Sequence, residues 1–157
     1  MSEIRNRTIQ GLQVGDTFTI SRRFTEEDMI SFADVTRDYN PVHLDSRFSG
    51  AKKFKDRICH GLLVGSMLTE IGGQIGWLAS VMNFRFKQPV YFGETITCRF
   101  TITEIDKRLR ACAKAVYFNQ NGDVVLTAEL KGILPDAAER RILNAMKTEG
   151  DPTNKIK

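Results

Sequence analysis

The stretch LLVGSMLTEIGGQI, residues Leu62–Ile75, decides the fold of this chain. Its apolar side chains cover more than one face of a helix, so the stretch predicts a helix buried on most sides. The glycines within it and directly after it, Gly65, Gly72, Gly73 and Gly76, each cost a helix roughly 1 kcal/mol relative to alanine. We therefore expect the helix backbone to approach a sheet or a ligand closely.

Four segments with the periodicity of β-strands follow this helix. Apolar and polar side chains alternate along them, and β-branched residues are common, as in half-buried strands. Asn121-Gly122, between the last two segments, is typical of a hairpin turn. The predicted strands are Val81–Lys87, Thr95–Ile105, Ala111–Phe118 and Val124–Leu134.

A strand and a helix precede the buried helix. Thr17–Phe24 alternates like a half-buried strand, and Thr25 is a suitable N-cap for a helix that ends near Thr36. The order of the elements predicts an α+β fold in which one dominant helix packs across an antiparallel sheet. Because the sequence contains no repeat or linker, we expect residues 1–157 to form a single domain.

Two other segments have weaker patterns. Ser46–Phe54 predicts a short helix or an irregular segment, with Phe48, Ala51 and Phe54 turned inward. Ala137–Lys147 predicts a short helix, and the polar stretch Thr148–Lys157 predicts a frayed tail.

The composition is that of an ordinary globular protein. The 157 residues are 41% hydrophobic and 27% charged, with a net charge of +4. No apolar run approaches the roughly 20 residues of a membrane span, and Met1–Gln10 lacks the apolar segment of a secretory signal. The three cysteines (Cys59, Cys98 and Cys112) are odd in number and have no CxxC spacing, so we expect reduced thiols and a cytoplasmic location. No basic cluster belongs to a recognisable nucleic-acid-binding module, so we expect no nucleic-acid partner.

The candidate functional motif is Asp38-Tyr39-Asn40-Pro41-Val42-His43. Pro41 fixes its own φ and moves Asn40 away from helical dihedrals, so the preceding helix should end here. A carboxylate and an imidazole on either side of a stiff turn can face one small substrate, as general acid–base chemistry requires. The alternative is that Asp38 and Asn40 only cap and turn the chain, as Asx-Pro segments often do.

This motif resembles the D-x-N-P-x-H core of the hydratase motif in the MaoC-like dehydratase and (R)-specific enoyl-CoA hydratase family. Ile58-Cys59-His60-Gly61-Leu62 is similar to the I-x-H-G-M/L sequence with which that family's central helix begins. Val14-Gly15-Asp16 and Pro89–Glu94 add weaker matches, and the resemblance extends from about Leu12 to Leu134. It implies the hot-dog fold, an antiparallel sheet wrapped around a long central helix. The family pairs such units, so the resemblance also implies a homodimer or a multiple of dimers.

The resemblance further implies a hydro-lyase reaction without a cofactor. Members interconvert (R)-3-hydroxyacyl and trans-2-enoyl thioesters carried on coenzyme A or acyl carrier protein. Asp38 and His43 would hold one water as base and acid, and the backbone N–H of Gly61 would donate to the thioester oxygen. Gly61 opens a helix, where N–H groups are unpaired and negative charge is favoured. Asn40 would orient the loop or the water, and Thr69 would contact the substrate near the pair, although an ordinary helix-to-sheet contact also explains Thr69.

Arg37 departs from the family pattern, which usually has glycine immediately before the motif aspartate. If that glycine has a positive φ, Arg37 must relieve the strain differently. We expect the departure to affect substrate preference more than the chemistry.

Other polar groups near the motif have weaker cases. We expect His60 to be structural and hydrogen-bonded to backbone. Cys59 is interpreted as a small buried hydrophobe, because adjacent residues do not generally face one another as a nucleophile and its base. Asp38, His43, Asp45 and His60 lack a standard metal-ligand spacing, so we expect no metal.

Two groups of residues are candidates for contacts with the carrier and the acyl chain. Lys52, Lys53, Lys55 and Arg57 suit the phosphates of coenzyme A or an acidic face of acyl carrier protein, and Phe48, Phe84 and Phe86 suit an acyl tunnel. Solvated surface and core packing explain the two groups equally well.

Two other functions fit the same sequence. A hot-dog thioesterase would also want a carboxylate near a helix N-terminus, although it does not need the pair of Asp38 and His43. A non-catalytic acyl-thioester binding module would keep the pocket without turnover, and Arg37 slightly favours it.

Overall fold

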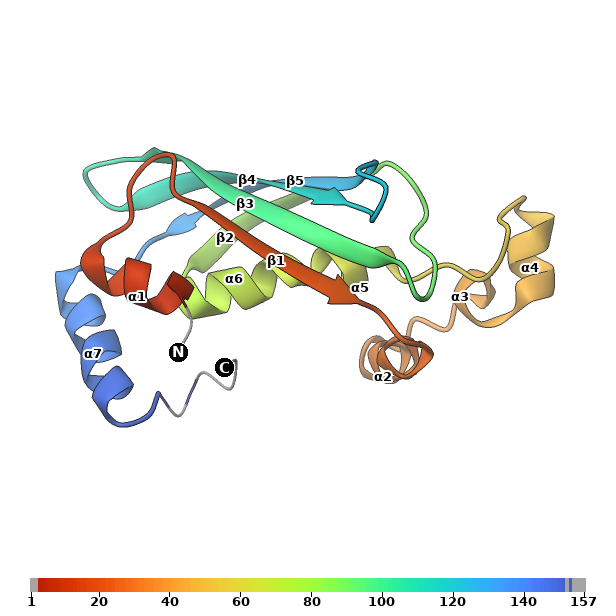
Figure 1. Cartoon of the computed structure of the whole chain (residues 1–157), viewed down its shortest axis with the longest axis horizontal. Helices are drawn as coiled ribbons and strands as arrows, with labels where there is room; N and C mark the ends of the chain where they lie inside the picture. Colours follow the sequence, from red (N-terminus) through yellow and green to blue (C-terminus); the bar gives the residue numbers. More distant parts are fainter. Residues whose placement is uncertain (1–2, 152, 154–157) are drawn as a thin grey trace.

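The fold is built on a five-stranded antiparallel sheet, which confirms the predicted α+β class (Figure 1). The computed structural model of the chain describes residues 3–151 and residue 153. Neighbouring strands in the order β1-β3-β4-β5-β2 are all antiparallel. The strands are Thr17–Arg23 (β1), Leu78–Phe86 (β2), Thr95–Ile105 (β3), Arg110–Phe118 (β4) and Val124–Ile133 (β5).

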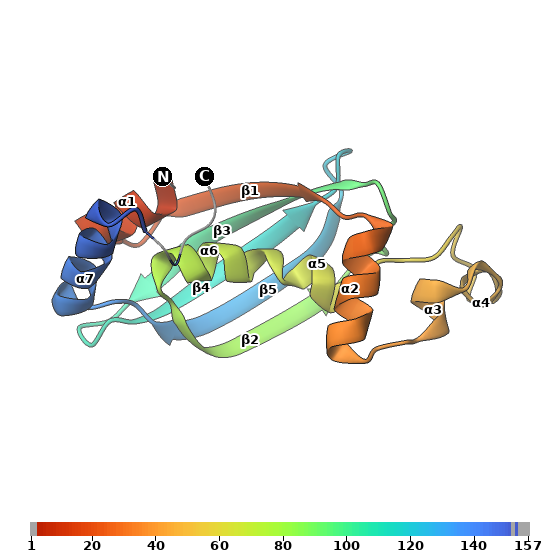
Figure 2. The same ribbon diagram turned by 90° about the horizontal axis from the view of Figure 1, so that it is seen from below.

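Helices cover one face of the sheet and both of its ends. α5 and α6 run along that face, α2 lies beside the start of α5, and α3 and α4 project beyond the sheet (Figure 2). α1 and α7 lie together at the opposite end. The helices are Glu3–Gln10 (α1), Glu26–Thr36 (α2), Pro41–Leu44 (α3), Ser46–Ala51 (α4), Gly61–Gly65 (α5), Met67–Ile75 (α6) and Ala137–Thr148 (α7). None of these described helices has the length and apolar character needed to cross a membrane.

The core lies between α6 and the sheet. Ile71 and Ile75 of α6 are fully buried, as are Ile96 and Ile102 of β3. Side chains alternate between buried and more exposed positions along β3 and β4, which is the pattern that predicted these strands.

The buried helix expected over Leu62–Ile75 is in fact two helices that meet at Ser66. A straight helix would pair the carbonyl of Gly65 with the N–H of Thr69. Instead, that carbonyl accepts the buried hydroxyl of Tyr117 at 2.8 Å, and the Thr69 N–H donates to the Ser66 carbonyl at 2.8 Å. Because Tyr117 lies on a distant strand, the helical sequence alone does not reveal the break.

The short helix α4 corrects the prediction that Phe48 and Ala51 turn inward, because both are exposed. Phe48 is 39% exposed, because α4 packs on α3 and both project beyond the sheet (Figure 2). Phe54, after α4, is half-buried as expected.

Contacts between the two ends of the chain were not predicted. α1 packs against α6 and α7. Arg5 and Asp151 are both buried, with Nε of Arg5 3.8 Å from Oδ2 of Asp151. The prediction of a frayed tail from Thr148 onward is therefore wrong for Asp151, and residues 152 and 154–157 lie outside the described part of the chain.

The helix α2 has the predicted start and an unexpected end. Thr25 Oγ1 accepts the N–H of Asp28, whose carboxylate accepts the N–H of Thr25 in return. The helix ends at Arg37, whose φ of 59° and ψ of 24° are left-handed. The position where the family usually has glycine thus has the positive φ that glycine favours, and Arg37 adopts this conformation instead of avoiding it.

Replacing Arg37 by glycine should therefore stabilise the protein by on the order of 0.5–1 kcal/mol, because an L-residue in this region is strained. Urea unfolding measures the difference in the free energy of unfolding. Arg37→Ala is the matched control, since it removes the guanidinium and keeps the Cβ. An equal gain in both variants would attribute the effect to the charge and contradict the backbone explanation.

Candidate active site

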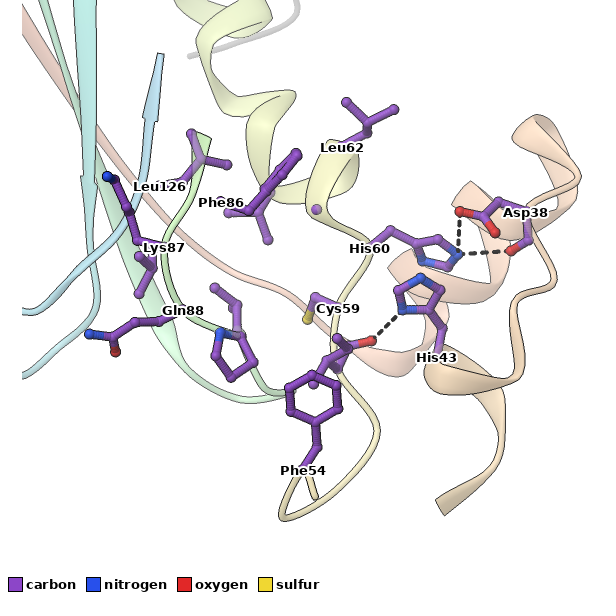
Figure 3. A pocket seen from close by; sticks show the side chains of 16 residues that line it. Asp38, His43, Phe54, Cys59, His60, Leu62, Phe86, Lys87, Gln88 and Leu126 are labelled. Atoms are coloured by element: carbon purple, nitrogen blue, oxygen red, sulfur yellow. Dashed lines mark hydrogen bonds and ion pairs between the residues drawn. The ribbon is translucent and has the colours of Figure 1, made fainter. Parts of the chain in front are cut away.

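A cavity of about 500 Å³ opens where α5, the end of β2 and the motif loop meet (Figure 3). Its apolar wall includes Phe54, Leu62, Val64, Phe86, Val125 and Leu126. The polar part of its lining includes Asp38, His43 and Gly61. The structure thus brings together the three residues that the sequence nominated for catalysis.

The turn between α2 and α3 fixes the first two of these residues. Pro41 is the first residue of α3, and the side-chain oxygen of Asn40 accepts the N–H of Val42 at 3.2 Å. Oδ1 of Asp38 accepts the N–H of Asn40 at 3.2 Å. His43 follows within the same short helix. Asp38 and Asn40 therefore do cap and turn the chain. The same turn also directs Asp38 and His43 to the cavity.

The hydrogen bond of His43 determines which ring nitrogen is free. Nδ1 lies 2.8 Å from the carbonyl oxygen of Ile58. A carbonyl can only accept, so Nδ1 carries the proton and Nε2 of the neutral ring has an open lone pair. His43 is 7% exposed, and this burial lowers its pKa below the ordinary 6.5. The ring is therefore neutral at pH 7 and can accept a proton at Nε2.

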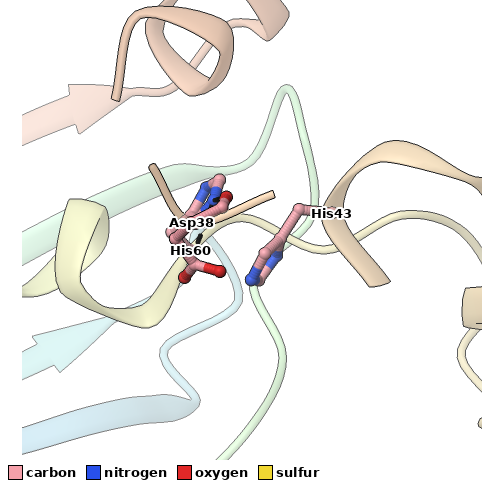
Figure 4. Close-up of side chains that lie close together, drawn as sticks. All are labelled: Asp38, His43 and His60. Atoms are coloured by element: carbon pink, nitrogen blue, oxygen red, sulfur yellow. Dashed lines mark hydrogen bonds and ion pairs between the residues drawn. The ribbon is translucent and has the colours of Figure 1, made fainter. Parts of the chain in front are cut away.

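The side chains of Asp38 and His43 lie close enough together for one water molecule to contact both. A carboxylate oxygen of Asp38 lies within 4.8 Å of a ring nitrogen of His43, and Figure 4 shows the two side chains next to each other. Two hydrogen bonds of about 2.8 Å to one bent water span roughly 4.5 Å. The Asp38 side chain is 50% exposed, so water can reach the gap.

His60 lies behind this pair. Its ring is 1% exposed, and Nε2 lies 2.9 Å from the main-chain carbonyl oxygen of Asp38. The prediction that His60 is hydrogen-bonded to backbone is confirmed. Its ring also stacks on His43, with centroids 3.8 Å apart and planes 27° apart, which the sequence did not reveal.

The three side chains do not fit a metal ion, although their candidate ligand atoms lie within 4.8 Å of one another. An imidazole binds a cation in the plane of its ring, along the nitrogen lone pair. The stacked rings of His43 and His60 occupy two roughly parallel planes, so one ion cannot lie in both. Asp45, another nominated ligand, caps α4 and pairs with Arg47.

Two other residues that the sequence singled out lie apart from this chemistry. Burial raises the pKa of the Cys59 thiol to about 12, so Cys59 is protonated at neutral pH and unsuited to nucleophilic attack. Thr69 is exposed, and its hydroxyl donates to the Ser66 carbonyl at 2.7 Å. Thr69 is not among the residues that line the cavity, and its role in substrate binding stays a prediction.

The basic segment after α4 lies at the mouth of the cavity, because Phe54 within it lines the cavity wall. Lys52, Lys53 and Lys55 are exposed, whereas Arg57 is paired with Glu26 at 2.6 Å. Lys87 and Gln88 also line the cavity. Lys87 and Gln88 were not predicted to line the site, because they directly follow a strand and belong to no recognisable motif.

The fold and the site together define a class of protein. A five-stranded antiparallel sheet packed around a central helical segment is the hot-dog fold, and here it presents a carboxylate and a neutral imidazole to an apolar cavity. The sequence model described as "MaoC like domain" matches residues 11–121. The chain therefore belongs to the MaoC-like dehydratase family.

Similar proteins agree with this membership. The (R)-specific enoyl-CoA hydratase of Aeromonas caviae is 31% identical over 132 residues, which cover 80% of this chain and 98% of that protein. A mitochondrial 3-hydroxyacyl acyl-carrier-protein dehydratase of Arabidopsis thaliana is 30% identical over 141 residues, with 86% and 84% coverage. The unliganded R-hydratase structure from Pseudomonas aeruginosa has a TM-score of 0.74 at 29% identity, covering 82% of this chain and 85% of that one.

Gly61 lets the start of α5 approach the Phe86 ring of β2 closely. A Cβ on Gly61 would lie 2.6 Å from Cε1 of Phe86, which is too close for two carbon atoms. Gly61→Ala should therefore cost stability only while the Phe86 ring is present, with a coupling of on the order of 1 kcal/mol in a double-mutant cycle with Phe86→Ala. Urea unfolding of the four proteins measures it.

Gly73→Ala is the control, because a Cβ at Gly73 would meet nothing within 4 Å. This variant should keep or raise stability, since alanine is the better helix former. Additive effects of Gly61→Ala and Phe86→Ala would contradict the packing explanation.

Proposed function

We propose that this protein is a hydro-lyase that interconverts (R)-3-hydroxyacyl thioesters and trans-2-enoyl thioesters. The observation that carries the proposal is that Asp38 and His43, with candidate ligand atoms within 4.8 Å of each other, face an apolar cavity together. The names of the similar proteins support it, since they are an enoyl-CoA hydratase and a hydroxyacyl dehydratase.

The protonation states of the pair suit the activation of water. An ionised Asp38 and a neutral His43 with an open Nε2 are both acceptors. A water between them donates both hydrogens and turns a lone pair toward the β-carbon of an enoyl thioester. The pair takes one proton as the C–O bond forms and returns one proton to the α-carbon, so it ends in its starting state.

The thioester oxygen needs a donor while it carries enolate charge. Gly61 lines the cavity beside His60 and begins α5, which has no side-chain cap. The first bond within this turn runs from the Val64 N–H to the His60 carbonyl, so the helix offers no acceptor to the N–H of Gly61. We assign the oxyanion contact to that N–H, and we assign Asn40 to holding the loop that carries Asp38.

The substrate is an acyl thioester of coenzyme A or acyl carrier protein. The apolar wall formed by Val64, Phe86 and Leu126 suits the acyl chain, and the exposed Lys52, Lys53 and Lys55 suit an anionic carrier. No cofactor is needed, because the reaction moves only water and protons. The three free cysteines support a reducing compartment such as the cytoplasm.

We also propose a homodimer or a multiple of it, paired through β2. This strand is at one edge of the sheet, and it exposes Leu78, Val81, Met82 and Phe86. An apolar edge strand with open backbone groups is suited to pairing with another strand. The other edge strand, β1, exposes mostly polar side chains, so it is the weaker candidate.

The test of the function is a short trans-2-enoyl-CoA, followed by its conjugated absorbance and by free thiol. The absorbance should fall without thiol release. Asp38→Asn should slow this fall in absorbance at least about 100-fold, because the substitution removes an acceptor for water's proton. Asp56→Asn is the matched control, since this exposed aspartate does not line the cavity. Thiol release would instead indicate hydrolysis, and unchanged absorbance with measurable binding would indicate a binding module.

The pH dependence of the reaction should reflect the protonation of the buried His43 imidazole. Because burial lowers the pKa of His43, the acid limb of the kcat/KM profile should have an apparent pKa below 6.5. The protonated ring has no lone pair for water, so activity falls as the pH drops through that value. An acid limb at or above 6.5 would contradict the assignment.

Stability gives an independent check on the same group. The unfolded chain has the higher His43 pKa, so it binds the proton first and the free energy of unfolding declines as the pH falls below 6.5. His43→Gln should remove this contribution. A proton NMR titration of the His43 ring measures its pKa directly.

A further inference from the structure

We infer that His60 is a positioning residue that holds both members of the water-binding pair, Asp38 through a hydrogen bond and His43 through ring stacking. The inference deepens the proposed function and rests on it. His60 does not act on the substrate itself in this account, because its ring is 1% exposed.

The hydrogen bond ties Asp38 to the start of α5. Nε2 of His60 donates to the Asp38 carbonyl at 2.9 Å and lies 3.9 Å from Oδ2 of the same residue (Figure 3). The other hydrogen bonds of Asp38 within the described chain join it to Thr36 and Asn40, in its own loop. The His60 bond spans 22 residues, so it sets where the loop sits relative to Gly61.

The stacking limits the movement of the His43 ring. The bond from Nδ1 to Ile58 fixes one atom of that ring, and the ring could still tilt about it. The face of His60, with its centroid 3.8 Å away, blocks the tilt on one side. Nε2 of His43 therefore keeps its direction toward the gap.

Histidine supplies both contacts at this position, and neither phenylalanine nor glutamine does. Phenylalanine would keep a flat ring without the donor, and glutamine would keep a donor of similar reach without the ring. Nδ1 of His60 is buried and has no hydrogen-bond partner in the described chain. Because Nε2 must carry the proton to donate to a carbonyl, Nδ1 is the nitrogen that the Nε2–H tautomer leaves without a proton. A ring chosen only for packing would not need to bury an unpaired nitrogen.

The two contacts are separated by His60→Phe and His60→Gln. A small displacement of a catalytic group can cost up to about 100-fold in rate, so His60→Phe should lower kcat by about tenfold to 100-fold, with KM nearly unchanged. In an Asp38→Asn background the same change should lower kcat by less than about twofold, because residues that act as a unit are not additive.

His60→Gln should be recognised by a shift in its pH profile. Loss of the stacked ring lets water reach His43, whose pKa is lowered mainly by burial. The acid limb of kcat/KM should therefore move up toward 6.5, and further than in His60→Phe, which keeps a flat ring over His43. The titratable groups that act on His43 are His60, which lowers its pKa, and Asp38, which raises it. His60 is removed in both variants, so the difference between their two acid limbs reports the burial that the flat ring provides.

Phe32→Leu is the matched control, since the Phe32 and His60 ring centroids lie 5.2 Å apart and the change alters this packing while both contacts to the pair stay in place. It should keep kcat and the pH profile even if it lowers the unfolding midpoint. Wild-type kcat in both folded His60 variants would overturn the inference. An equal loss of kcat in His60→Phe, His60→Gln and Phe32→Leu would reduce His60 to a packing role. That result would also overturn the inference.

A measurement on the unaltered protein covers the case in which the His60 variants do not fold. Nitrogen-15 NMR of the imidazole rings distinguishes the two neutral tautomers. His60 should carry its proton on Nε2, and a proton on Nδ1 would overturn the inference. If no enoyl thioester is hydrated by the wild type, the proposed function fails, whereas this NMR result can still be read on its own.

Discussion

The structure depends on the close approach of α5 to the edge strand β2. Gly61 and Gly65 lie one turn apart, so they share a face of α5, and Cβ atoms on them would lie 2.6 Å and 3.0 Å from the rings of Phe86 and Phe84. These rings, two residues apart on β2, stack with centroids 6.2 Å apart. Glycine is needed here for space, and not for a positive φ. The approach fixes the start of α5, and with it the hydrogen bond from His60 that holds the motif loop.

The motif loop shows that capping and catalysis need not be alternative explanations of one sequence. The side-chain oxygens of Asp38 and Asn40 accept N–H groups within the turn. Those bonds leave the second carboxylate oxygen of Asp38 available, since a carboxylate has about four acceptor sites. A stiff turn also reduces the conformational freedom that the site would otherwise lose on binding substrate. The Asx turn is therefore part of what makes the site work.

Features set by local chemistry could be predicted from the sequence, and features set by distant partners could not. Thr25 and Pro41 act within a few residues, and the start of α2 after Thr25 and its end before Pro41 were predicted correctly, whereas the short helix α3 that Pro41 begins was not predicted. The break at Ser66 depends on Tyr117, 52 residues from the carbonyl that it holds. The stacking on His43 joins two motifs that the sequence keeps apart, and folding brings their rings within 3.8 Å. The site residues were predictable because their chemistry is encoded in a short motif, whereas their spacing required the fold.

Phe86 connects the cavity with the edge of the sheet. Its ring lines the cavity wall and is also 56% exposed on β2, which is the edge proposed to pair with a second copy. Pairing there would remove Phe86 from water and restrict the positions open to its ring, because buried side chains lose rotamer freedom. That ring also packs against Gly61, whose N–H is the proposed donor to the thioester oxygen. Association of two copies would therefore act on the substrate site through a single side chain, without any need for the partner to reach Asp38 or His43.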